Sequence, residues 1–229
     1  MVELHARWLG FVDYLIGLRA HETDLLENGM RQTIFGMEHP LTITLGKRAD
    51  PLKDIRASVM VLKSRSAQIV AVDRGGQATL HNPGQLVIYP HIHLPTWGLG
   101  VREYVHRLQE ATLRLLVDYG VVATTVEREP GLYTERGKIA FFGLRIQNGW
   151  SSHGLALNVY NSLQDFDLIR ACGQTDQKIC AMAELTSITA TLPELFEQWC
   201  GHFTAVLNVD GVQMSGLTDE NRRPMVTDI

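Results

Sequence analysis

Two β-rich runs face one another across an Asn-Gly pair in the second half of the chain. They read KIAFFGLRIQN at 138–148 and SSHGLALNVY at 151–160, and Asn148-Gly149 marks the break between them. An Asn-Gly pair in this setting is a strong hairpin signal, because a type I′ turn needs positive φ at both central residues. The sequence therefore predicts a long antiparallel hairpin around which the remaining elements must be arranged.

Shorter β-rich runs and amphipathic segments surround this hairpin. The predicted strands lie at 33–35, 42–46, 69–73, 85–90, 121–126 and 131–135, and the predicted helices at 9–27, 101–119 and 193–207. Strands interspersed with long helices, without a regular βαβ alternation, indicate an α+β fold with a mixed, largely antiparallel sheet flanked by helices. We expect a single domain over residues 1–229, with a loosely ordered tail at about 210–229.

Length and charge narrow the class of protein. The chain has 229 residues, of which 45% are hydrophobic, a globular composition that suits one domain. Its 21 basic and 25 acidic residues give a net charge of −4, which argues against bulk nucleic-acid binding. No run approaches the roughly 18 apolar residues of a membrane span, and the first residues match neither a secretory nor a transit signal. We therefore expect a cytoplasmic protein.

Three cysteines and one histidine pair are the residues that could form a metal or redox centre. Cys172, Cys180 and Cys200 are too few and too widely spaced for a disulfide framework or a CxxC metal site. Cys180 and Cys200 have apolar neighbours and are interpreted as core residues, whereas Cys172 precedes a glycine in a polar loop and is predicted to be accessible. His91 and His93 have no suitably spaced partners, so we expect exposed or capping histidines and neither a metal nor a cofactor.

The segment RGGQATLHNPGQLVIYP at 74–90 combines glycine and proline breaks with Arg74 and His81. Glycines allow backbone N–H groups to approach a ligand closely, and the two side chains add a fixed cation and a titratable donor. The same sequence is also compatible with a purely structural role, as a pair of tight turns with a surface arginine and a half-buried histidine. The segment contains neither a Walker P-loop nor a GxGxxG motif.

A lysine and a histidine-glycine pair mark the predicted hairpin. Lys138 opens its apolar first strand and His153-Gly154 interrupts the second. A lysine at this place is exposed to desolvation, which suits it to proton transfer, although such a lysine more often extends its amine to water.

Taken together, these segments resemble the lipoyl(octanoyl) transferase family, a branch of the biotin/lipoate protein ligase superfamily. The resemblance covers about residues 46–182 and rests on RGGQATLHNPGQ at 74–85, KIAFFG at 138–143, HGLALN at 153–158 and ACG at 171–173. It implies a fold like the biotin/lipoate ligase catalytic domain. It also implies transfer of an octanoyl group from acyl-carrier protein to a lysine of a lipoyl domain, the first step of endogenous protein lipoylation.

Positions carried over from the family imply a site. Cys172 would hold the octanoyl thioester and Lys138 would serve as acid and base. The implied acyl pocket comprises Arg74, Gly75, Gly76, Gln77, Ala78, Thr79, Leu80, His81, Phe141, Phe142, Gly143, His153, Gly154, Leu155 and Ala156.

The chain departs from the family pattern at two positions. Ala171 stands where the family has proline, so the loop that presents Cys172 is less rigidly fixed. Asn82 stands where the family has glycine, which would hinder a backbone with positive φ at this position.

The resemblance also implies partners, and it leaves alternatives. The donor is octanoyl-acyl-carrier protein, and the acceptors are lipoyl domains of 2-oxoacid dehydrogenases and the glycine cleavage H protein; we expect a monomer. Because such carriers are acidic, the basic residues Lys47, Arg48, Arg74, Arg136 and Arg145 are candidates to attract them, unless folding scatters them. The alternatives are an ATP-dependent lipoate or biotin ligase, a noncatalytic acyl-binding module and a thioesterase.

Overall fold

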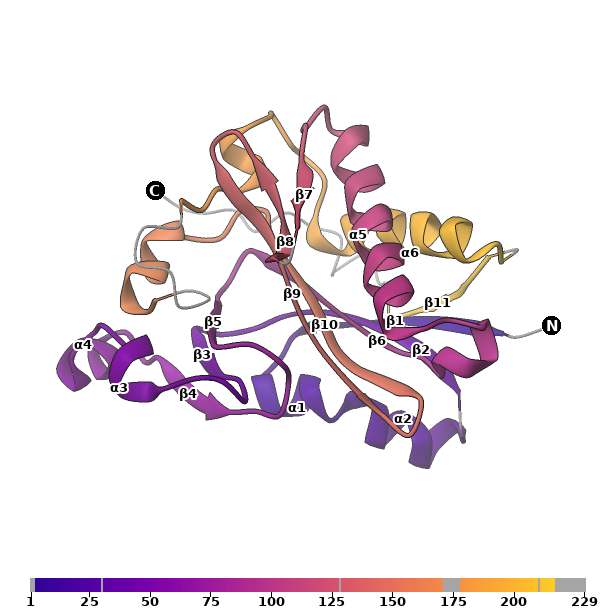
Figure 1. Cartoon of the computed structure of the whole chain (residues 1–229), viewed down its shortest axis with the longest axis horizontal. Helices are drawn as coiled ribbons and strands as arrows, with labels where there is room; N and C mark the ends of the chain where they lie inside the picture. Colours follow the sequence, from indigo (N-terminus) through magenta and orange to yellow (C-terminus); the bar gives the residue numbers. More distant parts are fainter. Residues whose placement is uncertain (1–2, 30, 128, 171–177, 210, 217–229) are drawn as a thin grey trace.

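The computed structural model describes residues 3–29, 31–127, 129–170, 178–209 and 211–216. An eight-stranded sheet runs through the molecule in the order β11-β1-β2-β6-β10-β9-β8-β7 (Figure 1). Its strands are β1 (Leu4–Phe11), β2 (Gln32–Glu38), β6 (Gln85–His91), β7 (Thr124–Val126), β8 (Glu129–Thr134), β9 (Gly137–Gln147), β10 (Trp150–Asn158) and β11 (Gln213–Ser215). β1 is parallel to β2 and β11, and the other neighbours are antiparallel, so the sheet is mixed.

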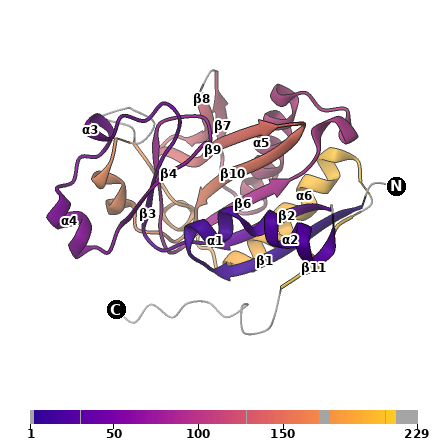
Figure 2. The same ribbon diagram turned by 90° about the horizontal axis from the view of Figure 1, so that it is seen from below.

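A second, three-stranded sheet has the order β4-β3-β5. It consists of β3 (Thr42–Leu45), β4 (Gln68–Ala71) and β5 (Ala78–His81), and the short helices α3 (Pro51–Asp54) and α4 (Val59–Ser64) connect β3 to β4. Figure 2 shows this small sheet with α3 and α4 at one end of the molecule, beside α1 and α2.

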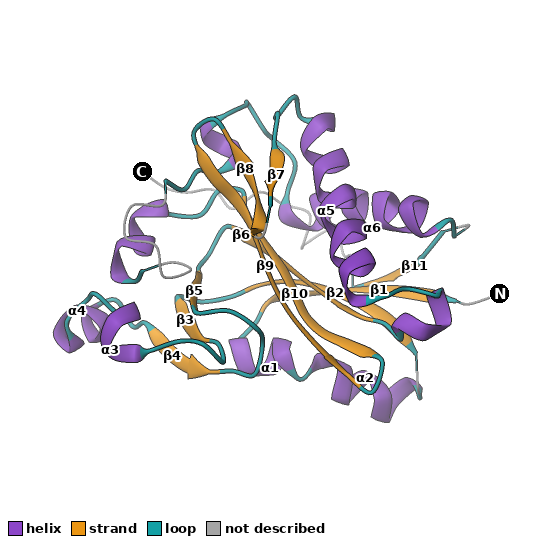
Figure 3. Ribbon diagram, viewed as in Figure 1, coloured by secondary structure: helices purple, strands orange, loops and turns teal. Residues whose placement is uncertain are grey.

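Helices cover both faces of the large sheet (Figure 3). On one face lie α5 (Val101–Asp118) and α6 (Leu192–Leu207), whose buried residues form the main core with Leu4, Ile34 and Leu86. On the other face lie α1 (Tyr14–Leu18) and α2 (Ala20–Asn28). The chain is completed by the 3-10 helices η1 (Leu94–Trp97), η2 (Leu163–Leu168) and η4 (Met182–Glu184). None of the helices in the described ranges is long and apolar enough to cross a membrane.

The predicted hairpin forms as β9 and β10. Asn148 and Gly149 have φ of 52° and 81°, as the type I′ turn requires. The helices predicted at 101–119 and 193–207 form as α5 and α6.

The helix predicted at 9–27 is wrong in its first part, because residues 9–11 form the end of strand β1. Leu4, Ala6 and Trp8 are buried at alternate positions, and this period of two places them in strand β1. The Asp13 side chain then accepts a hydrogen bond from Leu15 N and begins α1. Leu26, within the predicted helix, is 88% exposed.

The segment after Val209 lies partly within the described residues. Gln213–Ser215, predicted to belong to a loosely ordered tail, forms β11 and pairs with β1. Residues 217–229 lie outside the described ranges.

Candidate functional site

A cavity of about 190 Å³ lies between the central hairpin, the glycine-rich turn before β5, helix α1 and strand β8. Apolar and polar side chains share its lining. The lining residues are Tyr14, Arg48, Arg74, Gly75, Gly76, Gln77, Ala78, Thr79, His81, Tyr89, Glu129, Pro130, Tyr133, Lys138, Phe141, Phe142, Gly143, His153, Gly154, Leu155 and Ala156.

The structure brings the three predicted segments together around this cavity. Residues 74–79, His81, 141–143 and 153–156 all line it, as does Lys138. Leu80 is the exception: it is fully buried in a cluster with Ile43 and Phe141, because alternation along β5 turns it away from the cavity.

Lys138 lies at the start of β9 with only 1% of its surface exposed. The register between β8 and β9 shifts at Leu132/Tyr133, and this irregularity lets Lys138 share the cavity with Phe141. Its Nζ lies 4.9 Å from the centroid of the Phe141 ring and 5.2 Å from that of Tyr133, within cation–π range. The side chain does not reach bulk water, so the amine is held at the cavity.

A glycine makes room for this lysine. A Cβ atom on Gly131 would overlap Lys138 Cε and lie 3.0 Å from Nζ. Gly131 pairs with Phe141 across the two strands, so the β8 backbone lies directly against the lysine side chain.

Cys172, the predicted nucleophile, lies outside the described residues together with Ala171. Both flanks of that segment are described. On the upstream side Ile169 bridges to Ile55, and on the downstream side Ile179 forms a parallel bridge with Lys138. Lys138 N donates to Lys178 O at 2.8 Å.

The other two cysteines are core residues, as predicted. Cys180 and Cys200 are 1% and 0% exposed. Burial raises the pKa of both thiols, which disfavours the nucleophilic thiolate.

Arg74 is buried beneath the glycine-rich turn instead of lying on the surface. Its Nη2 donates to the Thr44 carbonyl at 3.0 Å and to Thr44 Oγ1 at 2.8 Å. Gly143 leaves space for it, since a Cβ there would lie 2.9 Å from Arg74 Cδ. Gly75 N donates to Leu144 O, which joins the turn to β9. The arginine and the glycines therefore fix the wall of the cavity.

Five aromatic rings in mutual contact form the opposite end of the site. The ring of Tyr14 lies 5.1 Å from that of His39 and 5.5 Å from that of His81, and Tyr89 lies 6.2 Å from His39 and 6.0 Å from His153. Burial lowers the pKa of His39 and of His153 to about 4, and that of His81 well below its usual value. Burial also raises the pKa of both tyrosines. The ring cluster is polar but uncharged at neutral pH.

Hydrogen bonds fix the tautomers of these histidines. Nδ1–H of His39 donates to Val12 O at 2.9 Å, and Nδ1–H of His81 donates to Gln85 Oε1 at 2.8 Å. Nε2–H of His153 donates to Asp73 Oδ1 at 2.9 Å, and Asp73 also pairs with Arg145. Each ring consequently keeps an unprotonated nitrogen.

His153 has an unusual backbone. Its φ of 57° is left-handed, a conformation that non-glycine residues seldom adopt and that is often associated with functional sites. The following Gly154 fits only because it lacks a side chain, since a Cβ there would overlap Ile88 O. The His-Gly pair thus bends β10 at the cavity.

Sequence reasoning missed Tyr14, His39 and Tyr89. Tyr89 falls only within the predicted strand at 85–90, and neither Tyr14 nor His39 belongs to any of the motifs described above. No local motif marks them, because they come from α1, the end of β2 and β6 and meet only in the folded chain.

The Asn82 departure causes no backbone strain. Asn82 is not among the positive-φ residues; the adjacent turn places φ of 87° at Gly84. Asn82 Nδ2 donates to Ser162 O and to Asp165 Oδ2, both at 2.8 Å, so its side chain joins the turn to η2.

Metal ligands do not cluster in the described residues, where no group of three or more His, Cys, Asp or Glu side chains is placed to hold an ion. His91 stacks on Trp150 and its Nδ1–H donates to Ser151 O, and His93 contacts Thr96 Oγ1.

Comparison with known proteins places this site in a family context. Residues 18–204 match the family described as lipoyl protein ligase A/B catalytic domain. The octanoyltransferase of Halorhodospira halophila is 39% identical over 172 residues, 74% of this chain and 76% of that protein. The octanoyltransferase of Koribacter versatilis is 36% identical over 219 residues, 92% of this chain and 87% of that protein.

Solved structures agree on the fold. A lipoate-protein ligase A bound with ATP superposes with a TM-score of 0.75 at 13% identity, covering 96% of this chain and 91% of that one. The biotin protein ligase of Aquifex aeolicus, in complex with biotin and ATP, gives a TM-score of 0.56 at 12% identity, covering 89% and 70%.

Proposed function

Because the chain belongs to the family of lipoyl protein ligase A/B catalytic domains and is an acyltransferase of protein lipoylation, we propose a specific reaction for it. It transfers an octanoyl group from octanoyl-acyl-carrier protein to a lysine of a lipoyl domain, through a thioester on Cys172. The acceptors are the lipoyl domains of 2-oxoacid dehydrogenases and the glycine cleavage H protein.

The position of Lys138 is the observation that supports this proposal most. A buried amine stands at a cavity large enough for a short acyl chain, and its own backbone is hydrogen-bonded to the segment that follows the cysteine loop. A ligase also uses a lysine, but the cysteine, 34 positions further along this sequence, supplies an acyl carrier that a ligase does not need.

The proposed first step exchanges one thioester for another. The Cys172 sulfur attacks the octanoyl carbonyl, and its proton passes to the Lys138 amine. The tetrahedral intermediate then expels the pantetheine sulfur, which takes that proton from Lys138 and leaves as a thiol. The two thioesters are nearly equal in energy, so this step is close to reversible.

The second step forms the amide. The ammonium of the incoming lysine first loses one proton to water. The neutral amine then attacks the Cys172 thioester and gives a second proton to Lys138, which passes it to the departing Cys172 sulfur. An amide is more stable than a thioester, so this step is downhill. Each proton that Lys138 accepts is passed on within the same step, so its protonation state is the same at the end of the cycle as at the start.

Proton transfer accounts for most of the expected contribution of Lys138. Lowering a thiol pKa from about 8.5 to about 7 raises the thiolate fraction at pH 7 roughly 15-fold, but the less basic thiolate is about fivefold less nucleophilic. A cation that acted only on the thiol pKa would therefore gain about threefold. General acid–base catalysis contributes about 10² to 10⁴.

The cavity lining is suited to the acyl chain. Phe141, Phe142, Leu155 and Ala156 provide apolar surface, and burial of each methylene of the chain contributes about 0.8 kcal/mol.

Intact-mass spectrometry tests the reaction. The protein is incubated with octanoyl-acyl-carrier protein, with and without a lipoyl domain and ATP, as wild type and as Cys172→Ser. We expect a thiol-labile adduct of one octanoyl group on the wild type that moves to the lipoyl domain without ATP, and none on the variant. Strict ATP dependence would instead indicate a ligase, and an adduct that is never transferred would indicate a binding module or a thioesterase.

A further inference from the structure

Basic charge is concentrated in one stretch of this acidic chain. Residues 47–65, which carry α3 and α4, contain six lysine and arginine residues and two aspartates, whereas the whole chain has a net charge of −4. Two of the six cations are in ion pairs: Lys53 with Asp50 at 3.1 Å and Arg65 with Asp165 at 2.6 Å. Lys47, Arg48, Arg56 and Lys63 are exposed and form no ion pair with another described residue.

Large apolar side chains lie among these cations. Leu52 in α3 is 95% exposed, and Val59 and Met60 in α4 are 67% and 82% exposed. Val59, Met60 and Lys63 share one side of α4 by their helical spacing. We call these three residues, together with the exposed Leu52 of α3 and the neighbouring Lys47 and Arg56, the α3–α4 face. Exposed apolar residues together with one sign of charge are typical of a surface that binds another protein.

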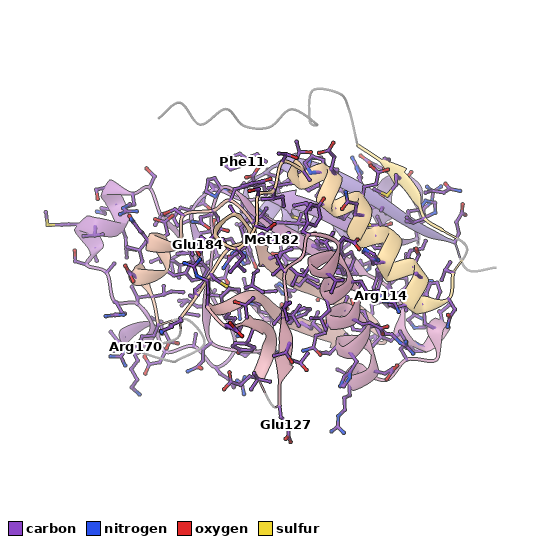
Figure 4. All side chains as sticks on the ribbon, turned by 90° about the horizontal axis from the view of Figure 1, so that it is seen from above. Phe11, Arg114, Glu127, Arg170, Met182 and Glu184 are labelled. Atoms are coloured by element: carbon purple, nitrogen blue, oxygen red, sulfur yellow. The ribbon has the colours of Figure 1, made fainter. Side chains whose placement is uncertain are left out.

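The α3–α4 face adjoins the proposed site. Arg48, in the same stretch, lines the cavity. Arg170 N donates to Asp54 O at 2.7 Å, and Arg56 N donates to Leu168 O at 2.9 Å, so the chain entering the cysteine loop is attached to α3. Figures 1 and 4 place α3, α4 and Arg170 at the same end of the molecule.

We propose that the α3–α4 face is the docking surface for the acyl donor, and that it recognises an acidic carrier domain whose acyl group hangs on a phosphate-bearing arm. This inference rests on the proposed function and adds a surface to it. The charges of the two surfaces are complementary. The cations of the face attract the acidic carrier, its apolar residues contact the carrier, and Arg48 at the cavity binds the anionic arm.

The cations of the face attract either acidic carrier, and the group that each carrier brings to the cavity distinguishes the donor from the acceptor. The acceptor must bring a lysine ammonium to the cavity, and Arg48 repels it. The lining residue Glu129, which accepts a hydrogen bond from Tyr133 Oη at 2.7 Å, belongs to β8, a strand of the other sheet. A carboxylate on that wall suits an approaching ammonium.

Of the five basic residues predicted to attract carriers, Lys47 and Arg48 are exposed near this face. Arg74 is buried against Thr44, and Arg145 pairs with Asp73. Arg136 donates to Glu184 O on another part of the surface.

The test compares a protein-bound donor with a small one. Steady-state transfer to a lipoyl domain is measured with octanoyl-acyl-carrier protein and with octanoyl-pantetheine, for wild type and for the triple variant Lys47→Glu, Arg56→Glu, Lys63→Glu. We expect KM for the carrier protein to rise about tenfold or more, because electrostatic attraction is reversed, while kinetics with octanoyl-pantetheine stay within about twofold. Raising the salt concentration should weaken the wild-type preference for the carrier protein.

Two controls make the result specific. Arg102→Glu reverses an exposed cation in the first turn of α5 and should leave both donors unaffected. Met60→Ser tests the apolar contact and should raise KM for the carrier protein alone. If the triple variant fails to fold, the milder Lys47→Gln, Arg56→Gln, Lys63→Gln should show a smaller shift in the same direction.

Three outcomes would overturn the inference: an unchanged KM for the carrier protein, an equal loss with both donors, or a rise in KM for the lipoyl domain alone, which would assign the face to the acceptor. In each of these the wild type still transfers octanoyl. Failure of the wild type to transfer octanoyl from either donor would instead contradict the proposed function.

Discussion

The two ends of the cavity are both buried and both polar, yet they are built differently. At one end the Lys138 amine lies against two ring faces and beside the segment that follows the cysteine loop. At the other end three imidazoles have their N–H groups committed to fixed acceptors. Leu144 pairs with His153, so the backbones of Lys138 and His153 are about 20 Å apart along the strands, and the lysine side chain extends to the Phe141 ring between them. The comparison teaches that burial alone does not make a group catalytic: under the proposed function only the lysine takes part in the reaction, while the imidazoles are committed to structural hydrogen bonds.

Replacing Lys138 should have the largest effect. Lys138→Met keeps the volume of the side chain but removes the proton carrier, so we expect octanoyl transfer to fall about 10² to 10⁴-fold. The free energy of unfolding should change little, because an apolar side chain of similar volume often replaces a buried charged one without loss. The matched control is Lys178→Ala, which removes a neighbouring exposed amine and keeps the backbone acceptor for Lys138 N. Equal losses in the two variants would remove the distinction between the ends of the cavity.

Crowding the lysine should have the next largest effect. In Gly131→Ala the new methyl group displaces Lys138 Nζ, and a misplacement of about 1 Å can lower the rate about 10²-fold. The control is Gly201→Ala in α6, where no described atom outside the glycine's own surroundings lies within 4 Å of the new Cβ. It should leave the rate unchanged and raise the free energy of unfolding by about 1 kcal/mol, measured by urea denaturation. Full activity of Gly131→Ala would show that the position of the amine is unimportant.

Lowering the pH should reduce the free energy of unfolding through the buried histidines. Burial lowers the pKa of His39 and His153 to about 4, below the unfolded value of about 6.5. The unfolded chain therefore binds protons that the folded chain rejects, and the stability contributed by each neutral histidine, about 3 kcal/mol, is present above pH 6.5 and lost between pH 6.5 and 4.

A substitution at His39 tests how much of this pH dependence of the free energy of unfolding comes from that residue. His39→Asn keeps a donor for Val12 O without a titrating ring, so the free energy of unfolding should depend less steeply on pH across this window. His106→Gln, at an exposed histidine, should keep the wild-type slope. An unchanged slope in His39→Asn would mean that the ring cluster tolerates charge.

Weakening the hold on His153 should have the smallest effect. Asp73→Asn keeps an acceptor for His153 Nε2–H but loses the ion pair with Arg145. Because Asp73 and Arg145 are partly exposed, we expect less than about 1 kcal/mol of destabilisation and nearly normal transfer. A large loss of activity with normal stability would move His153 into the chemistry and would contradict the comparison.

The sequence predicted the turns and helices whose formation depends mainly on residues close together in the chain. The Asn148-Gly149 turn, α5 and α6 carry their own signals of turn chemistry and helical period. Strand β1 was missed because its alternation at Leu4, Ala6 and Trp8 is short and runs directly into the apolar residues of α1. The end of β2 gives no warning of its role either, since His39 becomes a site residue only when Tyr14 and Tyr89 pack around it.

The parts of the cavity lining that belong to a continuous sequence motif could be predicted. The parts contributed by single residues from separate elements could not. The segments beginning at Arg74, Lys138 and His153 converge as their motifs imply. Arg74 was expected to present its charge to a ligand, but the sequence does not show that Thr44 would take up its guanidinium. Leu80 faces the core because a strand alternates within a motif that reads as continuous.

A pulse-chase experiment with peptide mapping tests the central claim most directly. Wild type and Lys138→Met are mixed with octanoyl-acyl-carrier protein and quenched over time, the octanoyl group is located by mass, and a lipoyl domain is then added. We predict a thioester on the Cys172 peptide that forms at least about 10²-fold faster in the wild type and passes to the acceptor lysine during the chase. An octanoyl group on Cys180, Cys200 or Lys138 that chases to the acceptor, or transfer that never passes through Cys172, would contradict the account.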